Sequence, residues 1–120
     1  MTNRCDAATR ALPGVAVIEL TGEIDGAAAD VLTRAYERAV TDADADVVAL
    51  DFASVGYINS TGIALIVSIL ARARAERRKV IASGLSAHYR EIFDITRLSD
   101  FIELFPDLDG AVSQLAGPAA

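Results

Sequence analysis

The stretch that decides the fold is residues 46–62, which have the sequence DVVALDFASVGYINSTG. Its first part, Asp46 to Phe52, is nearly continuously apolar, a pattern typical of a central strand covered on both faces in a parallel sheet. Its last part, Asn59-Ser60-Thr61, precedes an apolar run, and side chains of these types cap the N-termini of helices. The stretch therefore predicts a core strand, a strand-loop segment from Asp51 to Ile58, and the start of a helix.

Strands and helices are predicted to alternate on both sides of this stretch. Val15 to Leu20 is β-branched and bounded by glycine-containing turns, which is typical of a strand, and Arg10 to Leu12 can pair with it as a hairpin. Further strands are predicted at residues 79–82 and 102–105, and helices at residues 27–40, 61–76, 86–96 and 107–115.

This alternation predicts an α/β domain with a four- to five-stranded, mostly parallel mixed sheet packed with about four helices. The third helix is expected to carry Ile92, Phe93 and Ile95 inward. A length of 120 residues suits one domain. A hydrophobic content of 52% and a mean hydropathy of +0.34 exclude a disordered tail or linker.

The chain is acidic, and its charge is unevenly distributed. Eleven lysines and arginines against seventeen aspartates and glutamates leave a formal net charge of −6. This balance argues against non-specific binding to nucleic acid or to an anionic membrane, and it is compatible with a basic partner surface. Residues 1–60 hold four basic and ten acidic residues, whereas residues 61–120 hold seven of each, so the whole net charge lies in the first half.

The sequence contains no pattern typical of a leader or a membrane span. The N-terminus lacks an apolar run of signal-peptide length. The most apolar stretch, Gly62 to Ala71, is about half of the roughly 20 residues that a spanning helix needs. We therefore expect a cytoplasmic protein without direct membrane contact.

Few residues suit catalysis or metal binding. His88 is the one imidazole, and the chain has no nucleophile elbow and no phosphate-binding glycine loop. Cys5 alone forms no internal disulfide and, with a single histidine, no zinc site. The spacing of three aspartates is similar to that in the first half of a calcium-binding loop: Asp42, Asp44 and Asp46. The loop positions that need Gly and Glu hold other residues here. We expect no catalytic residue, no metal and no cofactor.

Two features of the helix predicted at residues 61–76 each have two interpretations. The basic cluster from Arg72 to Lys79 complements the negative end of the helix dipole, or it docks an anionic partner. The apolar stripe is broader than one sheet face needs, so part of it is covered by further core elements or belongs to a partner surface. The stripe consists of Ile63, Leu65, Ile66, Val67, Ile69 and Leu70.

Ser60, at the start of that helix, is the main functional candidate. As a cap, the run Asn59-Ser60-Thr61 accepts hydrogen bonds from unpaired backbone N–H groups. The same N–H groups and the positive end of the helix dipole suit a phosphate on Ser60, which adds a charge of about −1.5 to −2 without unfolding the helix. From the residues alone, both interpretations remain open.

Three stretches resemble the STAS domain family, and specifically the stand-alone bacterial anti-sigma factor antagonists. They are residues 20–25 (LTGEID), residues 48–62 (VALDFASVGYINSTG) and residues 89–98 (YREIFDITRL). Their order and separation are similar to those of the family from about Val15 to Leu115, and the middle stretch is the most specific.

The resemblance implies one STAS-type domain over residues 1–120. We expect its core at about residues 10–116, with frayed ends at residues 1–8 and 117–120. The resemblance also implies a protein-binding module and not an enzyme, present as a monomer or weak dimer.

Ser60 matches the serine that is phosphorylated in this family by the anti-sigma factor, a serine kinase with a histidine-kinase-like ATPase fold. The resemblance implies that the unphosphorylated form binds the anti-sigma factor and frees a sigma factor. Phosphorylation then releases the antagonist, and a PP2C-type serine phosphatase resets it. Thr61 is a minor alternative acceptor. The family often has Asp before this serine, where this chain has Asn59.

Partner binding is expected around Ser60. Asp25 matches the family's acidic residue after the first long strand, and Glu23, Asp25 and Asp51 are expected to converge near Ser60. Two other functions stay open: an accessory subunit of an ABC-type lipid transporter that binds its ATPase, and a nucleotide-sensing STAS domain. The predicted partner-binding residues are Glu23, Asp25, Tyr57, Asn59, Ser60, Thr61, Gly62 and Ile63.

Overall fold

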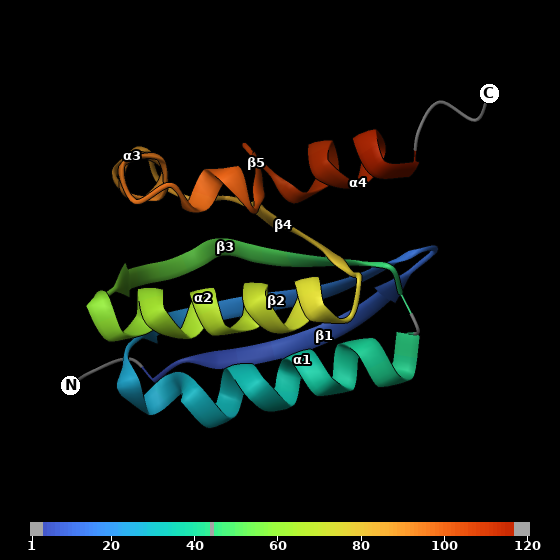
Figure 1. Cartoon of the computed structure of the whole chain (residues 1–120), viewed down its shortest axis with the longest axis horizontal. Coiled ribbons are helices and arrows are strands. Elements are labelled where there is room, and N and C mark those ends of the chain that lie inside the picture. The colour runs from blue at the N-terminus through green and yellow to red at the C-terminus, as the bar shows by residue number, and fades with distance from the viewer. Residues whose placement is uncertain (1–3, 44, 117–120) are drawn as a thin grey trace.

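The computed structural model describes residues 4–43 and 45–116. These residues form one five-stranded sheet and four α-helices (Figure 1). The strands are β1 (Asp6–Leu12), β2 (Val15–Ile24), β3 (Val47–Ile58), β4 (Lys79–Ser83) and β5 (Glu103–Phe105). The helices are α1 (Ala29–Ala43), α2 (Ser60–Ala75), α3 (Ala87–Ile95) and α4 (Leu108–Ala116). Short 3-10 turns cover Gly26–Ala28 and Leu98–Asp100.

The strands lie in the order β1-β2-β3-β4-β5, and only β1 is antiparallel to its neighbour. Each parallel crossover moves one place in the same direction along the sheet. Because such crossovers are right-handed, they place α1, α2 and α3 on one face, where α1 and α2 contact each other. α4 follows the last strand and packs on the other face. The predicted α/β class with a mostly parallel sheet is therefore confirmed.

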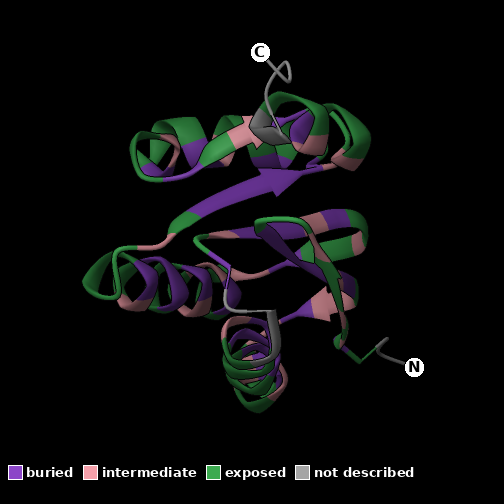
Figure 2. Cartoon of the chain, turned by 90° about the vertical axis from the view of Figure 1, so that its right-hand side faces the viewer, coloured by how far each residue is buried: buried purple, intermediate pink, exposed green. Residues whose placement is uncertain are grey.

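Two clusters of buried side chains form the core, one on each face of the sheet. On the face of the first three helices, Tyr36, Phe52 and Phe93 are at most 2% exposed. The rings of Phe52 and Phe93 meet edge to face, with 6.3 Å between centroids. On the other face, Ala49 packs in one cluster with Ala111 of α4. Figure 2 shows the buried residues along the strands and the exposed residues on the outer sides of the helices.

α4 covers only part of its face of the sheet. Side chains alternate between the two faces along a strand, so Asp51 and Ala53 point to the same face as Ala49. Ala49 is buried, whereas Asp51 is partly exposed and Ala53 is exposed. The carboxyl ends of β2 and β3 therefore extend beyond α4 and face solvent on that side.

β3 is longer than the sequence predicts. The region from Asp51 to Ile58 is strand throughout, and not a strand followed by a loop. It remains extended because it pairs with β2 as far as Ile24, through two irregularities in register. This extension carries the start of α2 to the far end of β2.

β1 is also longer than predicted. It begins at Asp6, which pairs with Thr21 of β2, so the expected fraying of residues 1–8 is wrong for residues 6–8. The reason is the antiparallel ladder, which satisfies the backbone groups of this segment over the full length of β1. Residues 1–3 and 117–120, also expected to fray, lie outside the described residues.

The third helix faces the core differently from the prediction. Ile95, predicted to face inward, is 72% exposed. Tyr89 and Phe93 form the buried side of α3 because residues four positions apart share one helical face. Ile95 lies only two positions beyond Phe93, which places it on the other side of the helix.

The residues considered for metal or catalytic chemistry are not brought together. Among residues 4–43 and 45–116, no His, Cys, Asp and Glu side chains form a group of three that could hold a metal ion. Asp44 of the imitated calcium loop lies outside the described residues. His88 is an exposed residue of α3, with its ring 4.9 Å from that of Tyr89. In the same part of the chain, no helix is long and apolar enough to cross a membrane.

Candidate functional site

The candidate site lies where the ends of β2 and β3 meet the start of α2. Ile24 pairs with Ile58 at the end of the parallel ladder, and the backbone N–H of Asn59 donates to the Ile24 carbonyl at 3.1 Å. One step earlier in the ladder, Glu23 lies opposite Tyr57. The sheet thereby brings the predicted residues of β2 next to those that lead into α2.

Asn59 is the N-cap of α2. Its side-chain Oδ1 accepts a hydrogen bond from the Gly62 N–H at 2.8 Å, and its carbonyl accepts from the Ile63 N–H at 2.9 Å. The Gly62 N–H is a donor that the first turn of a helix otherwise leaves unpaired, whereas the bond from Ile63 is the first ordinary hydrogen bond of the helix. An aspartate can accept the same side-chain hydrogen bond, so Asn59 keeps the capping function without the charge.

Gly62 allows α2 to begin in direct contact with the end of β2. A Cβ atom on Gly62 would lie 2.1 Å from the carbonyl oxygen of Ile24 and 3.0 Å from Cγ2 of Ile58. Gly62 is buried, so this residue, predicted to bind a partner, lies beneath the surface that a partner could touch. Its absent side chain sets how closely the helix approaches the strand.

Ser60 and Thr61 are both exposed at the first turn of α2. The N–H groups of this turn precede any intrahelical acceptor, and they form the positive end of the helix dipole. On the neighbouring segment, Gly26 approaches Thr61 closely, since a Cβ there would lie 3.4 Å from Thr61 Cγ2. Ser60 is therefore an accessible hydroxyl at a position that favours a negative charge.

Two acidic residues, Glu23 and Asp25, flank Ile24, whose carbonyl accepts from the backbone N–H that precedes this turn. Asp25 is partly exposed and caps the 3-10 turn that follows β2, because its Oδ1 accepts from the Ala27 N–H at 3.0 Å. Glu23 is also partly exposed, and its ladder neighbour Tyr57 is 51% exposed. Glu23 and Tyr57 alternate with the core residues Ile24 and Ile58, so their side chains point to the sheet face opposite α2, where Glu23 lines a hollow with Ser54.

Asp51 does not belong to the site, contrary to the prediction that it converges with Glu23 and Asp25. It pairs with Glu19 and Ser83 in the middle of the sheet, and its Oδ1 accepts from the Ala53 N–H at 3.0 Å. Asp51 lies seven positions before Ile58 on the same strand, a distance of roughly 20 Å. The prediction is wrong because it treated this segment partly as a loop.

Tyr89 supports the site from α3, and sequence reasoning gave it no role. Its hydroxyl accepts a buried hydrogen bond of 2.8 Å from the backbone N–H of Ile58. This bond fixes the last residue of β3 just before the cap of α2. Tyr89 opens the third resembling stretch, but nothing local in the sequence indicates that its partner is a backbone amide 31 residues away.

The broad apolar stripe of α2 belongs mostly to the core. Ile69 is 7% exposed, and Leu65 and Ile63 are partly buried against the large cluster. Only Val67 of the stripe is well exposed, at 42%. Ile63, which was predicted to bind a partner, therefore contributes mainly by packing, and core elements explain most of the stripe.

Cys5 is not arranged as a reactive thiol. Burial raises the pKa of the Cys5 thiol, and the nearby carboxylates of Asp6 and Asp25 raise the pKa further. A thiol must lose its proton to act as a nucleophile or a soft metal ligand. Cys5 therefore behaves as a small apolar residue beside β1.

The fold and the site together define a small α/β domain with a serine displayed at the start of a helix. The model of the family described as STAS domain matches residues 6–111. This chain belongs to the STAS domain family. That match covers all five strands and the whole of the candidate site.

Relatives within the family are named as antagonists of anti-sigma factors. An anti-sigma-B factor antagonist of Listeria monocytogenes is 32% identical over 87 residues, which are 72% of this chain and 75% of that protein. The crystal structure of an anti-sigma factor antagonist from Mycobacterium paratuberculosis has a TM-score of 0.75 at 24% identity and covers 94% of this chain and 95% of its own. Unphosphorylated SpoIIAA, also an anti-sigma factor antagonist, has a TM-score of 0.72 at 16% identity, covering 96% of this chain and 100% of its own.

Proposed function

We propose that this protein is an anti-sigma factor antagonist regulated by phosphorylation of Ser60. The unphosphorylated form binds an anti-sigma factor serine kinase through the surface around Ser60 and so frees a sigma factor. Phosphorylation ends this binding, and a PP2C-type phosphatase restores it. The observation that carries the proposal is the exposed Ser60 as first residue of α2, in a chain whose relatives are named as such antagonists.

The phosphate acts by charge and bulk at the surface, not by refolding the domain. A phosphoserine adds a charge of about −1.5 to −2 at the start of α2, close to the end of β2, where Glu23 and Asp25 flank Ile24. The N–H groups and dipole of α2 favour that charge, so the helix remains formed while a partner meets a more negative surface. The phosphorylated form of SpoIIAA supports this view, because it too has a fold similar to this chain, with a TM-score of 0.69 at 17% identity.

Asn59 is compatible with this mechanism. Its amide already performs the capping that the common aspartate performs, through the hydrogen bond from Gly62 N–H. The neutral side chain also removes one carboxylate that would repel a phosphoryl group arriving at Ser60. Thr61, exposed in the same turn, is the secondary acceptor in this proposal.

The partner surface in this proposal consists of Glu23, Asp25, Tyr57 and the exposed first turn of α2. Its negative charge favours a partner with a basic docking face. We propose a cytoplasmic protein that acts as a monomer or weak dimer, binds no nucleic acid and catalyses no reaction. The names of the relatives describe regulatory proteins, which supports the proposal that this protein catalyses no reaction.

The test uses purified anti-sigma kinases from the organism that carries this chain, with ATP. We expect Ser60→Ala to abolish most phosphate incorporation while retaining kinase binding, and Ser60→Asp to weaken binding at least tenfold. Ser54→Ala is the matched control, because Ser54 is an exposed serine of β3 outside the helix start. Undiminished phosphorylation of Ser60→Ala, or wild-type binding by Ser60→Asp, would contradict the proposal.

A pull-down with wild type and Ser60→Asp separates this function from the two others. Capture of a kinase by wild type alone supports the antagonist. Capture of a transporter ATPase by both proteins, with no anti-sigma kinase, favours the accessory-subunit function. Calorimetry with ATP, GTP and their diphosphates tests the nucleotide-sensing alternative.

A further inference from the structure

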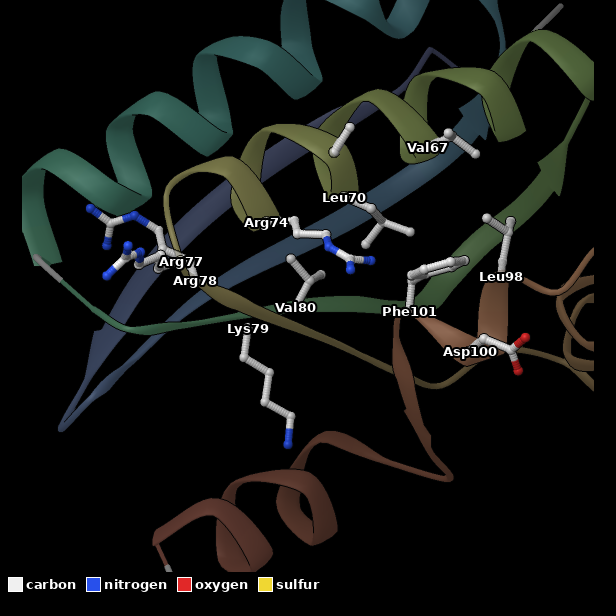
Figure 3. Close-up of a pocket in the computed structure, with 11 residues that line it drawn as sticks. Val67, Leu70, Arg74, Arg77, Arg78, Lys79, Val80, Leu98, Asp100 and Phe101 are labelled. Carbon is white, nitrogen blue, oxygen red and sulfur yellow. The ribbon is translucent and has the colours of Figure 1, made fainter.

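A separate pocket of about 670 Å³ opens beside the C-terminal half of α2 (Figure 3). Arg74, in its wall, is fourteen residues beyond Ser60 on the same helix, a separation of roughly 20 Å along the axis. The pocket is therefore distinct from the candidate site at the other end of α2. Its lining includes Val67, Leu70, Arg74, Val80, Leu98 and Phe101.

The walls of this pocket are mainly apolar. Leu70 and Val80 are buried residues of α2 and β4, and Leu98 joins them from the 3-10 turn that follows α3. At the edge, Phe101 is 58% exposed and Val67 is 42% exposed. Single exposed apolar residues are common on protein surfaces. Phe101 and Val67, however, lie at the edge of the same pocket and extend its apolar surface.

A positive charge stands at the edge of the pocket. The guanidinium of Arg74 lies 5.4 Å from the ring centroid of Phe101, and Figure 3 shows the two side chains directed toward each other. Within the described residues, no carboxylate lies within 4.0 Å of an Arg74 nitrogen. In contrast, Lys79 pairs with Glu103 at 3.2 Å, and Arg78 pairs with Glu76 at 3.4 Å.

Helix capping does not account for this arrangement. The N–H groups of Glu76, Arg77 and Arg78 already donate to the last carbonyls of α2, including that of Arg74. Backbone hydrogen bonds therefore satisfy the C-terminal carbonyls of α2, and the Arg74 guanidinium is not needed as a cap. Asp100 is the one carboxylate among the lining residues, and its own ion-pair partner is Arg97, at 3.9 Å.

We propose that this pocket binds a small amphiphilic carboxylate, with an aromatic or aliphatic body and one anionic group. The body packs on Leu70, Val80 and the ring of Phe101, and the carboxylate pairs with Arg74. Natural ligand pockets have volumes of about 300–1,000 Å³ and combine apolar walls with a few polar groups, as this one does. Arg77, Arg78 and Lys79 also line the pocket, but Arg78 and Lys79 are paired with Glu76 and Glu103. Figure 3 shows the Arg77 side chain directed away from Phe101, so Arg74 is the cation beside the apolar wall, which favours a ligand with one carboxylate.

The test is direct binding of three carboxylates, 2-naphthoate, indole-3-acetate and decanoate, by calorimetry and by amide chemical shifts. At least one is expected to bind with a dissociation constant below about 1 mM. Shifts should centre on Val67, Leu98 and Phe101. The neutral analogue of the bound compound, with an alcohol in place of the carboxylate, should bind at least tenfold more weakly.

Substitutions then assign the contacts. Arg74→Gln keeps much of the side-chain stem and should weaken binding about tenfold or more, because it removes the charge-assisted hydrogen bonds. Arg34→Gln, at an exposed arginine of α1, is the control and should bind as wild type does. Circular dichroism of both variants verifies that they are folded. Phe101→Ala should weaken the aromatic probes more than it weakens decanoate.

Three results would overturn the proposal. They are the absence of binding by all three carboxylates, equal binding by wild type and Arg74→Gln, and tighter binding of ATP or GDP than of any carboxylate at this pocket. The assay needs no kinase and no phosphorylation, so its outcome is independent of the function proposed for Ser60.

Discussion

Asn59 and Gly62 act together at the start of α2, although they do different things. Asn59 supplies an acceptor for a backbone N–H, and Gly62 supplies that N–H while leaving room for the carbonyl of Ile24. One residue therefore satisfies the helix end, and the other sets its distance from the sheet. Ser60 and Thr61 lie between them and remain exposed, which is what an accessible acceptor requires.

Gly62→Ala is expected to destabilise the protein by about 2 kcal/mol or more, because the new methyl group would overlap the Ile24 carbonyl and force the helix to shift. Urea denaturation followed by circular dichroism measures the change. Gly56→Ala is the matched control, since a Cβ on Gly56 meets no atom within 4 Å. Equal midpoints for the two variants would show that the close approach of α2 to β2 has no energetic consequence.

At the scale of elements, two tyrosine hydroxyls hold helices in place. Tyr36 of α1 donates to Glu76 Oε1 at 2.7 Å, just beyond the end of α2, and the Arg72 guanidinium lies 5.0 Å from the Tyr36 ring centroid. Tyr89 of α3 accepts from the Ile58 N–H at the end of β3. One hydroxyl therefore joins α1 to α2, and the other joins α3 to the strand that leads into the site.

Tyr89→Phe is expected to cost about 1–3 kcal/mol, because it leaves the buried Ile58 N–H without its acceptor. Hydrogen exchange should accelerate at the Ile58 amide, at the junction of β3 and α2. Tyr57→Phe serves as the comparison, since Tyr57 is 51% exposed and should change stability by less than about 0.5 kcal/mol. An Ile58 amide equally protected in wild type and Tyr89→Phe would refute the role given to Tyr89.

The raised pKa of the Tyr36 hydroxyl predicts a loss of stability at high pH. Burial, followed by the hydrogen bond and the charge of Glu76, raises the pKa of the Tyr36 hydroxyl from 10.0 to about 12. The folded state holds this proton more tightly than the unfolded chain does. Its contribution to stability is therefore fully present below pH 10 and is lost as the pH rises from about 10 through about 12.

Ultraviolet titration of tyrosinate measures this shift directly. We expect a tyrosinate step at about pH 12 in the folded protein, which belongs to Tyr36. Tyr36→Phe should remove that step. An unchanged titration curve in Tyr36→Phe, with the fold intact, would contradict the assigned environment of Tyr36.

At the scale of the whole molecule, the fold concentrates charge that is spread along the sequence. The net charge of −6 belongs entirely to residues 1–60, and the sheet places the end of β2, where Glu23 and Asp25 from that half flank Ile24, close to the first turn of α2. The other half has no net charge, and its Arg74 stands at a separate pocket. The two ends of α2 thus present surfaces of different chemistry.

Association with the anti-sigma kinase is expected to weaken as salt rises, since charges on exposed surfaces are screened within a distance of about 10 Å at 0.1 M. The double variant Glu23→Gln, Asp25→Asn should reduce both the association rate and its salt dependence, while the amide oxygen introduced at position 25 can still cap the 3-10 turn. Glu103→Gln, on the edge strand β5, is the control for the loss of a carboxylate elsewhere on the surface. Surface plasmon resonance at several salt concentrations compares both variants with wild type, and identical salt slopes would argue against electrostatic docking at this face.

The sequence by itself determined the α/β class, the central strand beginning near Asp46, a helix cap within the run Asn59-Ser60-Thr61 and the candidate Ser60. These features are local, because hydrophobic periodicity and capping depend on residues a few positions apart. The resemblance carried by residues 48–62 likewise lies within one continuous stretch and needs no tertiary information.

Only the tertiary structure decided the length of β3, the removal of Asp51 from the site, the burial of Gly62 and the role of Tyr89. It also decided that Leu70, Val80 and Phe101 enclose one pocket beside Arg74. Each of these depends on contacts between residues far apart in the chain. Local pattern predicts which segments become strands and helices, but the pairing of strands and the packing of helices decide which side chains meet.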